Sequence, residues 1–168
     1  MKKIPMACVQ GSAVRILLAL ILGLLVVSGY VVAPILFAKA GSSHEAGRLA
    51  GEIFHVVNNG VVIIAVAVAA FWLRMKSISR RSWGMLLVVA SLAAINEYGV
   101  SPIIAELKLA AGPIDQLAAD DPLKAQFGMW HGVSAVIHLL SSIMAVILLL
   151  TGVHGRADNG SKESCKES

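Results

Sequence analysis

The chain has 168 residues, of which 57% are hydrophobic and 14% are charged. A soluble domain usually has about a quarter charged residues, so this composition and the mean hydropathy of +0.79 indicate a protein in a lipid bilayer. The formal net charge is +4. The basic residues neither gather in one patch nor alternate with exposed aromatic residues, so we expect no nucleic-acid partner.

Four continuous apolar runs are each long enough to cross a membrane. A helix rises 1.5 Å per residue and needs about 20 residues to cross roughly 30 Å of hydrocarbon. Lipid offers no partner to unpaired backbone groups, so we predict helices. The predicted spans are residues 13–37, 49–73, 83–104 and 127–153. They predict an all-α integral membrane four-helix bundle over residues 1–154, with a disordered cytoplasmic tail over residues 155–168.

The two halves of the chain resemble each other. The first span contains "YVVAPILFAK" from Tyr30, and the third contains "YGVSPIIAELK" from Tyr98. The second span contains "IFHVVNNG" around His55, and the fourth contains "MWHGVSAV" around His131. We interpret this as an internal duplication, which predicts two pseudo-symmetric helix hairpins related by an axis along the membrane normal.

The basic residues indicate the orientation. Ten of the fourteen lie before or at the start of the first span, in the second connection or after the last span, and these are Lys2, Lys3, Arg15, Arg74, Lys76, Arg80, Arg81, Arg156, Lys162 and Lys166. Basic connections stay in the cytoplasm. We therefore predict a multi-pass protein of the bacterial inner membrane with both termini in the cytoplasm.

The polar residues of the spans gather in the outer halves, whereas the cytoplasmic halves are almost purely aliphatic. An ionisable group inside a span costs at least a few kcal/mol, so it should face the bundle interior or a hydrated cavity. We predict an outer-leaflet pocket lined by Tyr30, His55, Asn58, Asn96, Glu97, Tyr98, His131, Ser134 and His138.

Three functions fit such a pocket. His131 and His138 lie two turns apart, about 10 Å along the axis, so one metal ion does not take both. A copper-like ion would instead join His131 to His55 and Glu97, or His55 and His131 would be the axial ligands of a haem b. Alternatively, the polar residues only bridge helices in a non-catalytic scaffold. The third possibility is passage of protons or small solutes.

Nothing in the sequence indicates an enzyme, because no Ser-His-Asp set or phosphate-binding glycine loop is present and we assign no catalytic residue.

Two GxxxG patterns, Gly47 to Gly51 and Gly128 to Gly132, permit close helix packing and a homo-oligomer. Trp83 and Trp130 are expected to be interface anchors.

The segments "VVAPILFAKA", "AGRLAGEIFH", "NEYGVSPIIAELK" and "DDPLKAQFGMWHGVSAVIHLL" resemble the transmembrane protein 205-like family, also called domain of unknown function 4149. The positions that match its pattern are Pro34, Phe37, Gly47, Gly51, Pro102, His131, Gly132 and Ser134. His138 departs from the pattern, which has an amide residue there. The resemblance implies a four-helix membrane protein without a settled activity. The chain is more distantly similar to the copper-resistance D-like proteins, whose haem-containing relatives imply a metal or haem site by analogy.

Overall fold

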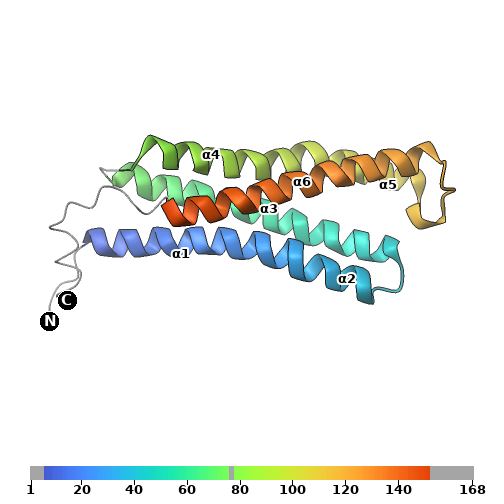
Figure 1. Ribbon diagram of the computed structural model, residues 1–168, viewed down its shortest axis with the longest axis horizontal. Helices are drawn as coiled ribbons and strands as arrows, with labels where there is room; N and C mark the ends of the chain where they lie inside the picture. The colour runs from blue at the N-terminus through green and yellow to red at the C-terminus, as the bar shows by residue number, and fades with distance from the viewer. Residues whose placement is uncertain (1–5, 76–77, 152–168) are drawn as a thin grey trace.

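The structure is a computed structural model that describes residues 6–75 and 78–151, with side-chain environments from residue 9. The described part contains helices and no strand, which confirms the all-α prediction (Figure 1). The elements are α1 (Met6–Val26), η1 (Val27–Val32), α2 (Ala33–Lys39), α3 (Ser43–Arg74), α4 (Arg80–Ile95), η2 (Asn96–Val100), α5 (Ser101–Ala111), η3 (Ile114–Gln116) and α6 (Pro122–Thr151). The predicted tail at residues 155–168 lies outside the described residues.

These elements form four continuous helical rods. Each is long and apolar enough to cross a membrane, and their bounds are Val9–Lys39, Ser43–Arg74, Arg80–Ala111 and Pro122–Thr151. The prediction of four helices long and apolar enough to cross a membrane is therefore confirmed. The rods pack antiparallel in a square, because the α1 rod contacts α3 and α6 while α4 also contacts α3 and α6 (Figure 1).

Each of the four rods extends beyond its predicted span at one end at least, and capping residues mark three of the helix ends. Ser42 precedes α3, and its Oγ accepts a hydrogen bond from the Glu45 backbone N–H at 3.1 Å. Gly112 ends α5 with a φ of 66°, which a residue with a side chain rarely adopts. At the start of α6, the Leu123 N–H donates to Asp121 Oδ1 at 2.8 Å. Hydropathy marks only the lipid-buried part of each helix.

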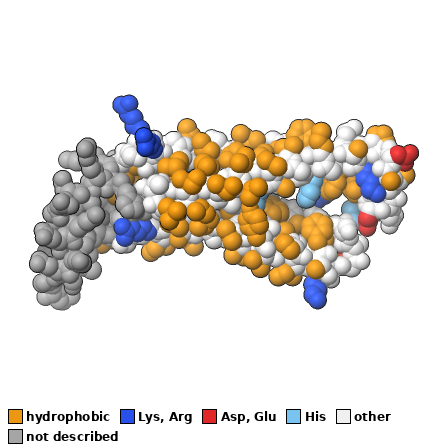
Figure 2. Space-filling model, viewed as in Figure 1, with side chains coloured by type: hydrophobic (Ala, Val, Ile, Leu, Met, Phe, Trp, Pro, Cys, Tyr) orange, Lys and Arg blue, Asp and Glu red, His pale blue; other side chains and the backbone are white. Residues whose placement is uncertain are grey.

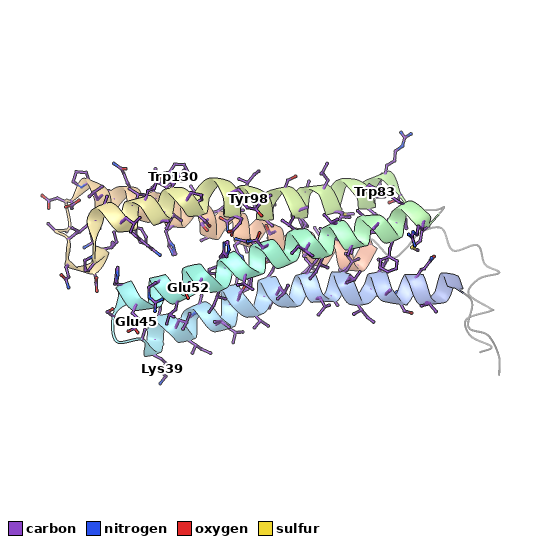
Figure 3. The ribbon with its side chains drawn as sticks, turned by 180° about the vertical axis from the view of Figure 1, so that it is seen from behind. Lys39, Glu45, Glu52, Trp83, Tyr98 and Trp130 are labelled. Carbon is purple, nitrogen blue, oxygen red and sulfur yellow. The ribbon has the colours of Figure 1, made fainter. Side chains whose placement is uncertain are left out.

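The two ends of the bundle differ. We call the end with the connections at residues 40–42 and 112–121 the distal end, and the end where α1 begins and α6 ends the terminal end. Towards the distal end, the α2–α3 pair parts from the α5–α6 pair (Figures 1 and 3). The space-filling surface is hollowed between these pairs, and histidine side chains lie in the hollow, which we call the distal cleft (Figure 2).

An apolar core fills the terminal half. It is built from Val14, Leu18, Ile21, Leu25, Val57, Val61, Ala65, Val68, Trp72, Leu86, Val89, Ala93, Ala145 and Leu148. Trp83, expected at the interface, packs edge-on against the buried Trp72 with ring centroids 5.4 Å apart. Lipid tails are as apolar as leucine, so this core stabilises the bundle by close packing rather than by removal from water.

The outer surface of the rods is apolar. Large side chains such as Ile63, Leu87 and Leu150 are more than half exposed, and hydrophobic side chains cover much of the visible surface (Figure 2). In water such a surface would aggregate. It is consistent with contact to a lipid bilayer, and the chain is a multi-pass membrane protein.

Two π-helical segments interrupt the rods at matching places. η1 ends two residues before Pro34, and η2 ends two residues before Pro102. In each segment the hydrogen bond reaches five residues back, from the Ala33 N–H to the Ser28 carbonyl and from the Ser101 N–H to the Asn96 carbonyl. A proline cannot donate to the carbonyl four residues before it, and the wider turn accommodates this loss. The shared feature supports the duplication.

Candidate functional site: a buried polar layer

Buried polar residues from all four rods meet near the two π-helical segments. We call them the polar layer, and its members are Ser28, Asn58, Asn96, Glu97, His138, Ser141 and Ser142. The contacts of Thr151 with Met85 and of Lys108 with Phe127 fix the antiparallel register of α6 against the α4–α5 rod. This register places residue 138 at the level of residue 97, so the layer crosses the bundle.

Glu97 is the centre of this layer. It lies in η2 and is 5% exposed. Its Oε1 is hydrogen-bonded to Nδ1 of His55, and its Oε2 accepts from Nδ2 of the buried Asn58 at 3.2 Å. Both partners lie on α3, so the carboxyl group ties η2 to α3. A π turn inserts one extra residue, and the consecutive Asn96 and Glu97 are both buried.

His55 connects this buried carboxyl group with the surface. The His55 side chain is 67% exposed, whereas that of Glu97 is 4% exposed. The polar contacts continue outside the layer, because Asn59 Nδ2 donates to the His55 carbonyl at 2.8 Å and the Tyr98 hydroxyl donates to Asn59 Oδ1 at 2.6 Å. Only one of the two ring nitrogens of His55, Nδ1, is bonded to Glu97.

His138 occupies the opposite side of the layer. It is 8% exposed, and its Nε2–H donates to the Leu25 carbonyl at 2.9 Å. Its ring packs edge-on to Phe54, with centroids 5.1 Å apart, and tilted against Tyr30 at 6.0 Å. A Cβ at Gly29 would lie 2.6 Å from Cδ2 of His138 and closer still to Nε2. Only glycine therefore fits beneath this imidazole.

Two acceptor atoms in the layer have no hydrogen-bond partner among the described residues, Oδ1 of Asn96 and Nδ1 of His138. A buried acceptor without a partner costs about 1–3 kcal/mol. The other polar groups of the layer are hydrogen-bonded, so these two atoms are its least favourable points.

Lys108, Phe127 and His131 form a second cluster nearer the distal end. Lys108 Nζ donates to the Gly47 carbonyl at 2.9 Å and lies 5.9 Å from the centroid of the Phe127 ring. The Phe127 and His131 rings are stacked, with an interplanar angle of 12° and centroids 5.8 Å apart. We did not predict the position of Lys108, because helical periodicity does not say which residues of neighbouring rods meet.

The predicted pocket is thus divided. His55, Asn58 and Glu97 are in direct contact, Asn96 lies in the same layer, and Tyr98 reaches them through Asn59. The remaining predicted residues make no hydrogen bond to this group. His138 lies in the polar layer but packs against η1, His131 stacks in the second cluster, Ser134 is half-buried, and Tyr30 is 49% exposed. Gly29, Phe54 and Phe127 contribute contacts that we did not predict.

The described residues form no metal site, and their contacts give no support to the predicted haem or copper-like metal. In this part of the chain no group of three or more His, Cys, Asp or Glu residues is arranged to hold a metal ion. His55 pairs with Glu97, and His138 donates to a carbonyl. His131 stacks on Phe127, and the Lys108 ammonium lies over the same ring. This positive charge would repel a metal cation at His131. We therefore derive no chemistry through a metal or haem.

The two GxxxG patterns also differ in their surroundings. Cβ atoms at Gly47 and Gly51 would lie 3.7 Å and 3.9 Å from Lys108 Nζ, so this glycine face receives a lysine from α5. At Gly128 and Gly132 a Cβ would meet nothing within 4 Å. Packing explains the first pair, and association of copies through the second stays a prediction.

A comparison with family models matches residues 16–113 to the family described as "Domain of unknown function (DUF4149)". The match covers more than half of the chain and includes both π-helical segments, His55 and Glu97. No curated protein and no solved structure matches the chain. The more distant likeness to the copper-resistance D-like proteins stays a prediction.

Proposed function

We propose that this chain, which belongs to the DUF4149 family of unknown function, is a membrane protein that binds and releases a proton at the Glu97–His55 pair. The observation that carries the proposal is a buried carboxyl group inside a span, bonded to an imidazole that is two-thirds exposed. Ionisable residues inside spans are rare and mark proton or ion sites. The pair therefore serves proton passage better than the other predicted functions.

The chemistry follows from the two ring nitrogens. The exposed Nε2 of His55 takes up a proton, and the Nδ1 proton can move to Oε1 of Glu97 in the same event. Asn58 donates to Oε2 and holds the carboxyl group in place in both states. The pair carries one negative charge before uptake and none afterwards, so proton binding removes a charge from the bundle interior.

Exchange takes place from the distal side in this proposal. Below the polar layer, the terminal half is closed by the apolar core, where Ile21, Val61, Val89 and Leu148 are at most 1% exposed. Such packing leaves no room for a chain of water. The site therefore loads from one side, and transfer to the other side would need the terminal half to open.

We further propose that the protein lies in the bacterial inner membrane with both termini in the cytoplasm. The positive-inside distribution of lysine and arginine supports this orientation. The distal end and its cleft would then face the periplasm. A reporter enzyme fused to the C-terminus and active only in the cytoplasm tests this orientation, and an inactive reporter on a folded fusion overturns it.

The test of the proton site is an NMR titration of the histidine rings in detergent micelles. The His55 signal, assigned with His55→Gln, should respond to pH with a midpoint that changes in Glu97→Gln. Glu106→Gln is the matched control, because this exposed glutamate lies on the same rod. Identical midpoints in the wild type and in Glu97→Gln would refute the proposal.

The scaffold interpretation is the competing candidate, and a specific observation favours it. Bonds from Glu97 to α3, from His138 to the Leu25 carbonyl and from Lys108 to the Gly47 carbonyl all join different rods. If the polar residues only bridge helices, Glu97→Gln lowers the melting temperature and leaves the His55 titration unchanged. An absorption spectrum and metal analysis of the same preparation test the haem and copper prediction.

A further inference from the structure

Lys108 is a cation held inside the bundle. It lies in a rod that can span the membrane, and it is half-buried. Lysines near helix ends usually extend outwards to water. Lys108 instead crosses to α3, where Gly47 and Gly51 leave space for it and the Gly47 carbonyl accepts one of its three protons.

No carboxylate neutralises this ammonium among the residues that the structure describes. The ion pairs found there are Arg48–Glu52 and His55–Glu97, and neither involves Lys108. The Lys108 ammonium has two further N–H donors beyond the bond to Gly47. An uncompensated charge inside a span costs at least a few kcal/mol, so an anion supplied from outside would stabilise this arrangement.

His131 adds a second nitrogen donor next to the same aromatic ring. Its ring is stacked on Phe127, and the same ring lies beneath Lys108. His131 is exposed, so its nitrogens are accessible. The two side chains therefore present N–H groups next to one aromatic surface, at the distal end where the helix pairs part and histidine side chains line a hollow (Figure 2).

We infer that Lys108 and His131, together with Phe127, form a site in the distal cleft for the phosphate group of a ligand. An ammonium and an imidazole N–H together suit a tetrahedral oxyanion with several acceptor oxygens. Both groups lie against the Phe127 ring. The phosphate can belong to a lipid headgroup or to free phosphate. This site is separate from the Glu97–His55 pair and does not depend on the proposed proton binding.

The experiment follows the His131 ring signal by NMR in micelles during titration with two probes, a short-chain phosphatidylglycerol and inorganic phosphate. In the wild type the signal should shift saturably with at least one probe. Saturation by the lipid alone assigns a lipid headgroup, and saturation by inorganic phosphate assigns a free phosphate. No saturable shift with either probe overturns the inference.

Two variants separate binding from folding. Lys108→Met keeps the length of the side chain and should weaken binding at least tenfold, whereas Lys124→Met, at another distal lysine, should leave it unchanged. If Lys108→Met does not fold, His131→Phe keeps the aromatic stack and removes the second donor, and its binding is read from a Phe127 ring signal. Wild-type affinity in folded Lys108→Met, or in His131→Phe, contradicts the site.

Discussion

The terminal and distal halves of the bundle are built on different principles. In the terminal half, aliphatic side chains from four rods interlock around Trp72, and this packing holds the bundle together. In the distal half, a buried carboxyl group, a buried imidazole and a half-buried ammonium occupy the interior of the same rods. The rods also contain their π turns where the two halves meet. The difference indicates that close packing stabilises the terminal half, whereas the distal half holds the ionisable groups on which the proposals rest.

The two hairpins share a π turn but differ in the residues that this turn carries. Each has a π turn two residues before a proline. In the second hairpin this turn carries Glu97 just before Tyr98, whereas in the first hairpin Gly29 just before Tyr30 leaves room for His138. The same backbone feature thus positions the proposed proton site in one hairpin and a packed histidine in the other.

The largest effect is expected in the terminal core. Leu18 is 2% exposed, so Leu18→Ala should lower the free energy of unfolding by about 2–5 kcal/mol because it leaves a cavity. Leu109 is 86% exposed, and Leu109→Ala should change it little. Reversible unfolding in mixed micelles measures both. A similar loss in the two variants would contradict the division into a packed half and an open half.

A somewhat smaller effect is expected at the first π turn. Gly29→Ala should destabilise the protein by about 1–3 kcal/mol, because the new methyl group overlaps the His138 ring. Gly23→Ala, where a Cβ meets nothing within 4 Å, is the control. In a His138→Ala background the cost of Gly29→Ala should largely disappear. An equal cost in both backgrounds would show that His138 is not the cause.

The smallest effect is expected on the exposed side of the second π turn. Tyr98→Phe removes the bond to Asn59 and should lower the free energy of unfolding by about 0.5–1.5 kcal/mol. Tyr30→Phe, at the corresponding position of the first hairpin, should change it less. Thermal denaturation of the two variants side by side makes the comparison, and equal losses would mean that the Asn59 bond contributes nothing.

The four spans were predictable because continuous apolar runs identify membrane helices directly. The partner of Glu97 was also predictable, since His55 lies at a similar depth in another span. The contacts of His131 and Lys108 were not, because a helix that is apolar all round gives no sign of which face meets its neighbours. His138 has no counterpart in the other hairpin, yet it is the most buried histidine of the predicted pocket, because Gly29 makes room for it.

The ends of the rods and the π turns depend on local backbone bonding rather than on hydropathy. Ser42 caps α3 several residues before its apolar run begins, and Gly112 ends α5 several residues after its apolar run has ended. The repeated Tyr-to-Pro segments indicated that something is shared by the two hairpins. That it is a π turn follows only from the hydrogen bonds to carbonyls five residues back.

The most direct test of the proton site is a pH-difference infrared spectrum of the purified protein between pH 4 and pH 9. The exposed carboxyl groups give a common band in all variants, so the test is a further carboxyl component that should be present in the wild type, absent in Glu97→Gln, retained in Glu106→Gln and changed in His55→Ala. A spectrum that is the same in the wild type and in Glu97→Gln would contradict the assignment of this buried carboxyl group as the site where the proton binds.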